Sequence, residues 1–273
     1  MARVGLSEQE LLRIAVPIAA EAAAMAQRMR AEAITDFGTK STITDVVTAA
    51  DTAVERLISD ALRAVRPGDA MLGEELGTDL GTASSDSQVR WIVDPIDGTV
   101  NYLYGIEQYA ISIAAELDGE VVAGVVHNAA TGRVWTAARG HGAWRDGRRL
   151  TGSTQTDLAQ TLVATGFAYI AARRAHQGRV VAGLLPRVRD IRRMGSAALD
   201  LCAAAEGQVD AFYEKGLNAW DMAAGGLIAR EAGLLMTGLH GRPPGHDLVL
   251  VAPPALHPQL HDVLSELDAA GGP

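Results

Sequence analysis

The chain has 273 residues, enough for one large α/β unit or two closely packed halves. Hydrophobic residues make up 48% and charged residues 21%, which excludes a largely disordered protein, and a formal net charge of -9 disfavours nonspecific binding to nucleic acid or to an anionic membrane. A single cysteine, Cys202, excludes an internal disulfide and favours a reducing cytoplasm. The alanine-rich N-terminal stretch is interrupted by charged residues and Pro17, so we expect neither a signal peptide nor a membrane span.

Helices followed by strands are predicted for the first half of the chain. Ser7 and Glu10 form a capping-box pair, which predicts a helix from residue 8 to about residue 33. Apolar residues at helical spacing predict a second helix over 52–65. The residues that follow predict a polar loop over 78–88 and then strands over 90–94, 109–117, 120–127 and 133–138, which we expect to form an antiparallel sheet.

Strands and helices alternate in the second half, a pattern that predicts a second, α/β sheet. The tail after Leu267 is rich in alanine, glycine and proline, and we expect it to be frayed. The predicted strands lie over 161–165, around 191, over 209–213 and over 248–252, and the predicted helices lie after 171, over 196–205 and over 219–232.

Asp94 and Asp97 stand near the end of a predicted strand in the string Asp-Pro-Ile-Asp-Gly-Thr. An arbitrary Asp-x-x-Asp is most often a polar turn, but two carboxylates this close repel each other unless a cation lies between them. Magnesium prefers oxygen ligands and keeps room for water and phosphate. The backbone N–H groups of Gly98 and Thr99, at the start of a predicted helix, could bind phosphate oxygens.

Three further acidic residues lie at the ends of predicted elements. Glu74 follows a short predicted strand, and Asp51 and Asp221 stand at the predicted starts of helices. Asp51 or Asp221 alone would most often be a helix cap. Together with Glu74 and the Asp94 segment they form a set of oxygen ligands.

These motifs resemble the signatures of the inositol monophosphatase family, within the wider group of lithium-sensitive, magnesium-dependent sugar and nucleotide phosphatases. The signatures read Trp-Ile-Val-Asp-Pro-Ile-Asp-Gly-Thr-Val-Asn over 91–101 and Trp-Asp-Met-Ala-Ala-Gly over 220–225, with shorter matches over 73–75 and 48–51. The resemblance implies an α+β fold, a layered αβαβα sandwich in one compact unit. In it, residues 1–150 form a metal-binding half with an antiparallel sheet, and residues 151–273 form a mixed α/β half. It also implies a homodimer.

The resemblance implies a magnesium site with two to three ions. Glu74, Asp94 and the Ile96 carbonyl would bind one Mg²⁺, Asp94, Asp97 and Asp221 a second, and a third, weaker ion would touch Glu74. Thr99 and Asp51 would orient and deprotonate the attacking water, so no covalent phosphoenzyme would form. Contacts with substrate are implied for Asp97, Gly98, Thr99, Gly195, Ser196, Ala197, Glu214 and Asp221.

The implied activity is hydrolysis of myo-inositol 1-phosphate and similar monoesters. Histidinol phosphate, a 3'-phosphoadenosine nucleotide and fructose 1,6-bisphosphate are alternative substrates, and a bisphosphate should require an extra basic pocket. Asn218 stands where animal members carry histidine, which leaves the substrate open. Some bacterial relatives are implicated in ribosomal RNA synthesis, so a transcription-associated binding protein is a second alternative, although the net charge disfavours direct contact with RNA.

Other candidate sites are weaker. Arg187, Arg189, Arg192 and Arg193 form one basic cluster, which could face a substrate phosphate or a partner but is more typical of a solvated patch. His257 and His261 have the spacing of zinc ligands on a helix, but Pro258 follows the first, which indicates the start of a surface helix. Cys202 lies among apolar residues and is expected to be buried.

Overall fold

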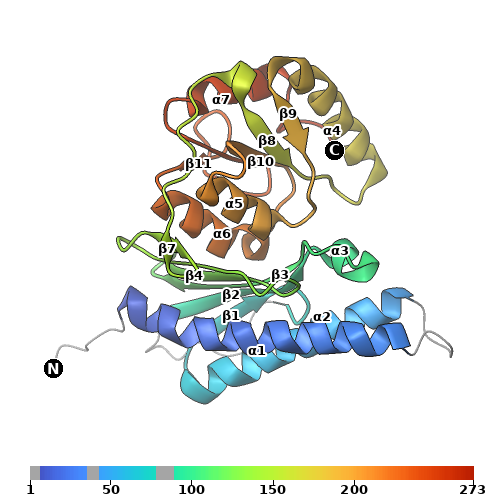
Figure 1. The fold of residues 1–273 in the computed structure, drawn as a ribbon, viewed down its shortest axis with the longest axis vertical. Helices are drawn as coiled ribbons and strands as arrows, with labels where there is room; N and C mark the ends of the chain where they lie inside the picture. The colour runs from blue at the N-terminus through green and yellow to red at the C-terminus, as the bar shows by residue number, and fades with distance from the viewer. Residues whose placement is uncertain (1–6, 36–42, 78–88) are drawn as a thin grey trace.

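The structure is a computed structural model that describes residues 7–35, 43–77 and 89–273. The polar loop predicted over 78–88 lies outside these ranges. Five layers stack in the order helices, sheet, helices, sheet, helices, so the predicted αβαβα sandwich is confirmed (Figure 1). Among the described residues, no helix is both long and apolar enough to cross a membrane.

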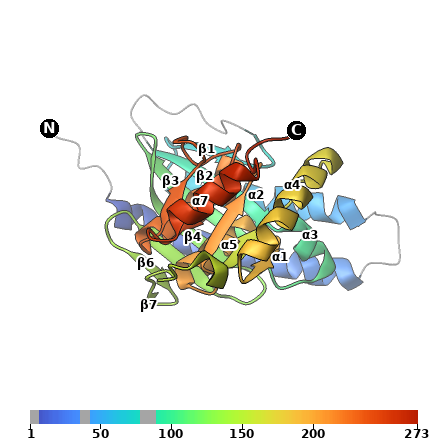
Figure 2. The same ribbon diagram turned by 90° about the horizontal axis from the view of Figure 1, so that it is seen from above.

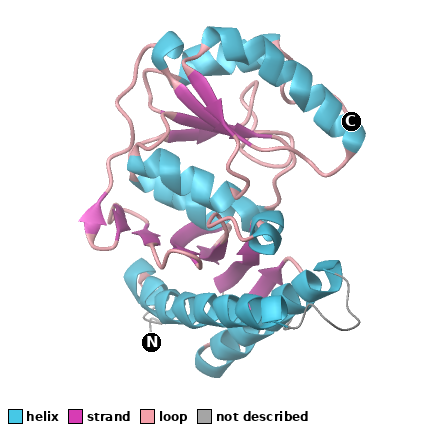
Figure 3. Ribbon diagram, turned by 45° about the vertical axis from the view of Figure 1, so that its right-hand side comes forward, coloured by secondary structure: helices cyan, strands magenta, loops and turns pink. Residues whose placement is uncertain are grey.

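Two pairs of helices cover the outer faces, and a third pair lies between the sheets (Figure 3). Seen from above, α7 and α4 lie over the second sheet (Figure 2). The outer helices are α1 (Glu8–Thr35) and α2 (Ile43–Val65) on the first sheet, and α4 (Ala171–Leu184) and α7 (His257–Glu266) on the second. The middle helices are α5 (Ala197–Glu206) and α6 (Ala219–Glu231).

The first sheet is antiparallel except at one edge, where β1 and β2 are parallel. A parallel pair needs a long crossover, and the chain between Gly73 and Val89 is long enough to provide one. The antiparallel pairing predicted for the strands over 90–94, 109–117, 120–127 and 133–138 is confirmed, and the parallel β1–β2 pair at the edge adds to it. In spatial order the strands are β1 (Ala70–Gly73), β2 (Val89–Asp97), β3 (Ala110–Leu117), β4 (Glu120–Asn128), β5 (Val134–Ala138), β6 (Ala143–Arg145) and β7 (Arg148–Arg149).

The second sheet is mixed, as predicted. Its central strands β10 and β8 are parallel to each other, whereas β12 runs antiparallel to both of its neighbours. In spatial order the strands are β11 (Leu235–Thr237), β12 (Val249–Ala252), β10 (Ala211–Glu214), β8 (Leu162–Thr165) and β9 (Asp190–Arg192). Two 3₁₀ turns, η1 (Leu158–Gln160) and η2 (Leu185–Arg187), connect elements on this side.

Three local predictions can be compared directly with the structure. The capping box is confirmed, because the Ser7 backbone N–H donates to the Glu10 carboxylate at 2.8 Å. Helix α2 begins at Ile43, so Asp51 lies inside a helix and not at its start as predicted. The tail after Leu267 is not frayed, because Ala269 is buried in the core beneath the second sheet.

Helix α6 fits between the sheets because it carries small residues on several sides. A Cβ on Gly225 would lie 2.9 Å from the Leu201 Cβ on α5. On the sheet side, a Cβ on Gly124 of β4 would lie 2.9 Å from the Ala224 Cα. This close approach fixes the helix that carries Asp221 against the first sheet.

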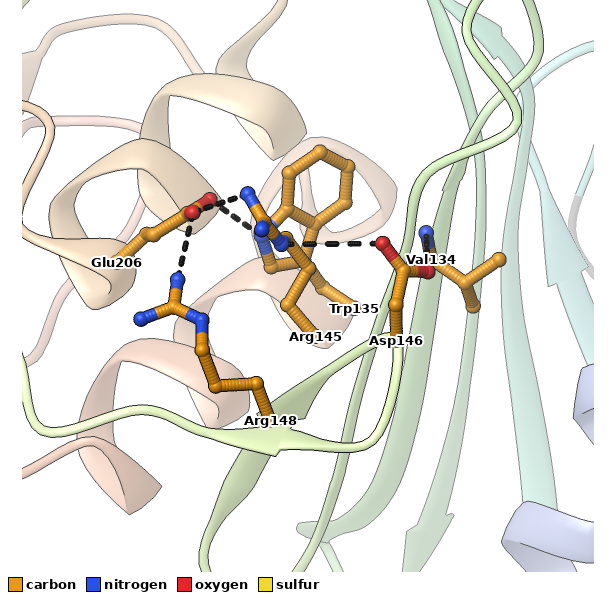
Figure 4. Close-up of polar contacts among 6 residues, drawn as sticks. All are labelled: Val134, Trp135, Arg145, Asp146, Arg148 and Glu206. Carbon is orange, nitrogen blue, oxygen red and sulfur yellow. Dashed lines mark hydrogen bonds and ion pairs between the residues drawn. The ribbon is translucent and has the colours of Figure 1, made fainter.

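Glu206, at the C-terminal end of α5, ties the middle layer to the edge of the first sheet (Figure 4). Its carboxylate accepts hydrogen bonds from Arg145, from Arg148 at 2.7 Å and from the Trp135 indole at 3.3 Å. The Glu206 side chain is 6% exposed, so water screens these contacts little. This cluster holds β5 and the β6–β7 hairpin against α5.

Candidate active site

Asp94 and Asp97 reach the same site because β2 is irregular near its end. The pairing of β2 with β3 shifts register between these two residues, and the strand continues to Asp97 instead of ending at Asp94 as predicted. Such a shift re-aims side chains that a regular strand would point to opposite faces. Gly98 then turns the chain into α3 (Thr99–Tyr104) with a φ of 92°. A Cβ there would lie 2.6 Å from the Gln108 carbonyl oxygen, so the turn requires glycine.

Glu74 is brought beside Asp94 by the parallel pairing of β1 with β2. Gly73 pairs with Val93, so Glu74 and Asp94, the residues that follow them, lie side by side. Burial, followed by the charge of Asp221, raises the pKa of Glu74 to about 7. The parallel pair thus delivers two carboxylates to one place.

Glu55 holds the turn that contains Glu74, a role that the sequence analysis missed. Its carboxylate accepts hydrogen bonds from the backbone N–H of Glu75 at 2.8 Å and of Leu76 at 3.1 Å. Glu55 lies four residues after Asp51, on the same face of α2. That spacing was a signal that could have identified it.

Asp221 comes to the site from the first turn of α6. Its Oδ2 accepts a hydrogen bond from the Asn218 backbone N–H at 2.6 Å, which fixes the start of the helix. Oxygen atoms of Asp94, Asp97 and Asp221 all lie within 4.8 Å of one another. Residues from both halves of the chain therefore meet in one acidic cluster.

The electrostatics of this cluster favour a cation. Burial and then the charge of Glu74 raise the pKa of Asp94 well above its usual range, and burial and then Asp221 raise the pKa of Asp97 to about 7. Asp94 Oδ1 is buried and lacks a hydrogen-bond partner among the described residues. Oxygen donors that repel one another and are not satisfied by the protein suit a hard divalent ion.

Ser196 positions Asp97 instead of lining the cavity. Its hydroxyl donates to Asp97 Oδ2 at 2.5 Å, and the Ala198 backbone N–H donates to the same oxygen at 2.7 Å. Ser196 also caps α5 and is almost fully buried. The Ser196 hydroxyl thus holds one oxygen of the acidic cluster in place, and the substrate contact expected for Ser196 stays a prediction.

Asp51 is also buried and does not line the cavity. Burial, followed by the charges of Glu75 and Glu74, raises its pKa to about 8. Thr99 does line the cavity, and its hydroxyl donates to the Ile96 carbonyl oxygen at 3.2 Å.

A cavity of about 400 Å³ contains the acidic cluster and the remaining predicted residues. Glu214 lines it, and burial followed by the charge of Asp97 raises the pKa of Glu214 to about 8. Among the described residues, the predicted site residues that line this cavity are Glu74, Asp94, Ile96, Asp97, Gly98, Thr99, Gly195, Ala197, Glu214 and Asp221.

A sequence profile of the inositol monophosphatase family matches residues 7–269. The chain belongs to this family. The inositol-1-monophosphatase of Mycobacterium leprae is 48% identical over 265 residues, which cover 91% of each chain. The Nus factor SuhB of Salmonella typhimurium is 41% identical over 207 residues, 76% of this chain and 75% of that protein. The solved structure of Mycobacterium tuberculosis SuhB has a TM-score of 0.82 and 39% identity, and the match covers 98% of this chain and 100% of that one.

These similarities confirm the predicted family and identify the chain as a phosphatase. Its acidic cluster has the composition of a metal site. In this inositol monophosphatase family member, the basic cluster is mostly engaged elsewhere: Arg187 pairs with Glu266 and Arg192 with Asp190. Arg193 alone of that cluster lines the cavity, with its guanidinium 5.9 Å from the Phe167 ring centroid.

The other candidates have structural roles. His257 starts α7 as predicted, and its Nε2 lies 2.9 Å from the Thr237 hydroxyl. His261 Nε2 accepts a hydrogen bond from the His240 backbone N–H at 3.2 Å. Cys202 is buried and unpaired in α5, as expected.

Proposed function

We propose that this phosphatase hydrolyses myo-inositol 1-phosphate and similar monoesters with Mg²⁺ as its cofactor. The observation that carries the proposal is the meeting of Asp94, Asp97 and Asp221 within 4.8 Å, in a cavity that Glu214 also lines. The acids supply oxygen ligands for Mg²⁺, and Glu214 supplies an acceptor for hydroxyl groups.

Two ions would share the acidic cluster, with room for a third, weaker one beside Glu74. Glu74, Asp94 and the Ile96 carbonyl would hold the first, and Asp94, Asp97 and Asp221 the second. The unpaired Oδ1 of Asp94 and the raised pKa values of the set support this assignment. When bound, Mg²⁺ polarises the phosphoryl group and neutralises the negative charge that develops during its transfer.

The residues around the ions would bind the phosphate and activate water. The backbone N–H groups of Gly98 and Thr99, at the start of α3, would donate to phosphate oxygens. The Thr99 hydroxyl would orient the attacking water, and the Asp51 carboxylate would receive its proton. Burial raises the pKa of Asp51 above its usual range, which makes it a stronger base than an exposed aspartate.

The alcohol half of the substrate would lie against Glu214. In its ionised form Glu214 accepts hydrogen bonds from ring hydroxyls, and Gly195 and Ala197 line the same cavity without bulky side chains. A Cβ on Gly166 would lie 2.1 Å from the Glu214 carboxylate oxygens. Any larger residue at 166 would therefore displace the Glu214 side chain.

A substrate panel with released phosphate as the readout tests the proposal. Inositol 1-phosphate should be hydrolysed with a higher kcat/KM than histidinol phosphate, a 3'-phosphoadenosine nucleotide or fructose 1,6-bisphosphate. A preference for the bisphosphate would contradict the proposed substrate, and no hydrolysis of any monoester with Mg²⁺ would contradict the metal site.

A transcription-associated role is a second candidate because one relative is named a Nus factor. The net charge of -9 disfavours direct binding to RNA. Salt-resistant binding to a transcription factor would favour this role, whereas RNA binding that disappears at physiological salt would count against it.

A further inference from the structure

The C-terminal strap, defined as residues 268–272, packs against α4 beside the cavity wall. The chain end lies next to α4 (Figure 1). His176 Nε2 on α4 lies 2.8 Å from the Asp268 carbonyl oxygen, and the Arg173 Nε donates to the Pro273 carbonyl oxygen at 3.0 Å. Ala269 is buried and anchors the strap in the core.

Lys215, which directly follows Glu214, binds the strap through its ammonium group. Its Nζ donates to the carbonyl oxygens of Ala270 at 2.7 Å, Gly271 at 2.7 Å and Gly272 at 3.2 Å. An ammonium has three N–H donors, so these three acceptors satisfy it completely. Lys215 is 9% exposed, and such a buried cation would be costly without these contacts.

The choice of lysine fits this geometry. The chain has only two lysines, Lys40 and Lys215, and arginine supplies its other basic side chains. A compact ammonium can direct its three donors at three consecutive carbonyl groups, whereas the planar fork of a guanidinium cannot. The strap also requires its glycine at 272, because a Cβ there would lie 2.6 Å from the His176 ring.

Gln177 connects two segments that line the cavity, residues 166–170 and residues 214–218. Its Oε1 accepts from the Ala168 backbone N–H at 2.9 Å, and its Nε2 donates to the Lys215 carbonyl oxygen at 3.4 Å. Ala168 belongs to the loop over 166–170, and Lys215 to the segment over 214–218, both of which line the cavity. A shift of the strap would therefore displace both of these segments.

We propose that Lys215 is a positioning residue that locks the segment over 214–218, which contains Glu214, to the C-terminal strap. This lock would set the affinity for the alcohol half of the substrate. The proposal rests on the proposed role of Glu214. The acidic cluster is built from other elements, β1, β2 and α6, so its chemistry should not depend on the strap.

Two variants test the lock. Lys215→Met keeps the length of the side chain but removes all three donors, and a chain that ends after Ala269 removes the three acceptors but keeps the buried anchor. Each variant should raise the KM for inositol 1-phosphate roughly tenfold, because a displaced Glu214 carboxylate would lose hydrogen bonds to the ring hydroxyls. The kcat should change little. The KM for an aryl phosphate, which has no polyol hydroxyls, should stay near its original value.

A variant that combines Lys215→Met with the shortened chain tests whether the two changes act through the same contact. If Lys215 and the strap act through each other, the double change should raise KM no more than either single change. A multiplied effect, or equal losses on both substrates, would overturn the proposal. Arg187→Met is the matched control, because it removes an exposed cation that pairs with Glu266 near the same chain end.

Hydrogen exchange over 166–170 and 214–218 tests the lock without any substrate. Exchange in both segments should be faster in either variant than in the control, and unchanged exchange would overturn the proposal. If Lys215→Met does not fold, the shortened chain carries the same comparison, because its ammonium can meet water. Failure of the original protein to hydrolyse inositol 1-phosphate would contradict the proposed function, and the exchange measurement would still test the lock.

Discussion

Replacing Asp221 with asparagine separates its two contributions, a helix cap and a metal ligand. The asparagine side-chain oxygen can still accept from the Asn218 backbone N–H, which now lies 2.6 Å from Asp221 Oδ2. The start of α6 should therefore survive. What disappears is one negative charge among three carboxylates that lie within 4.8 Å.

The loss of this charge should have opposite effects with and without metal. Two like charges 4.8 Å apart repel by about 3 kcal/mol at an effective dielectric constant of about 20. Because burial raises the pKa of each acid, part of this repulsion is already relieved by protonation. We therefore expect the metal-free variant to gain about 1 kcal/mol, or about 2–4 °C in Tm. With Mg²⁺ bound, the variant should be less stable than the original protein. Its turnover should fall about a hundredfold or more.

Thermal melts with and without Mg²⁺, calorimetric Mg²⁺ titration and phosphate release measure these effects. Asp157→Asn is the control, since Asp157 caps η1 by accepting from the Ala159 backbone N–H at 2.9 Å, outside the cavity. Near-normal turnover with unchanged Mg²⁺ stoichiometry would refute the assignment of Asp221 as a ligand. A collapse of the metal-free melt would show that Asp221 is mainly a structural cap.

Four further predictions follow from the site and the fold. Glu214→Gln should raise the KM for inositol 1-phosphate roughly tenfold but not that for an aryl phosphate, as steady-state kinetics would show; equal losses would contradict its role in recognition. In metal-free protein, denaturant titrations should show the free energy of unfolding falling as pH rises from about 4 to 8, because Glu74 and Asp97 have pKa values of about 7 when folded and lower values when unfolded. Saturating Mg²⁺ should flatten this dependence, and a rise with pH would contradict it. Lithium at millimolar concentration should inhibit phosphate release uncompetitively, and full activity in high lithium with half-saturating Mg²⁺ would contradict the two-ion assignment. Glu206→Ala should lower the free energy of unfolding in urea by about 2–4 kcal/mol, since Arg145 and the Trp135 indole lose their shared partner; an unchanged midpoint would refute this.

The layers of the fold and most of the residues that line the cavity could be predicted from the sequence, because the signatures over 91–101 and 220–225 carry the family resemblance. The sequence did not reveal the true start of α2. Residues 43–48 are rich in β-branched side chains, which have low helix propensity, so their sequence did not predict that the helix begins at Ile43. Because of that start, Asp51 lies inside the helix.

Contacts between distant residues were also beyond the local patterns. The Ser196 hydroxyl reaches Asp97, 99 residues away in the chain, and the Lys215 ammonium reaches Ala270 over 55 residues. A glycine-rich tail reads as frayed until the cation that binds its carbonyl groups is known. Arg173 and Tyr169 line the cavity, yet nothing in their neighbouring sequence indicates this position.

The central claim is that Glu74, Asp94, Asp97 and Asp221 bind the catalytic ions. Crystals grown with Mn²⁺, which accepts the same oxygen ligands as Mg²⁺, would test it through anomalous scattering. We predict at least two adjacent peaks, one beside Glu74 and Asp94 and another beside Asp94, Asp97 and Asp221. A fully occupied ion elsewhere, with no peak at these carboxylates, would contradict the account.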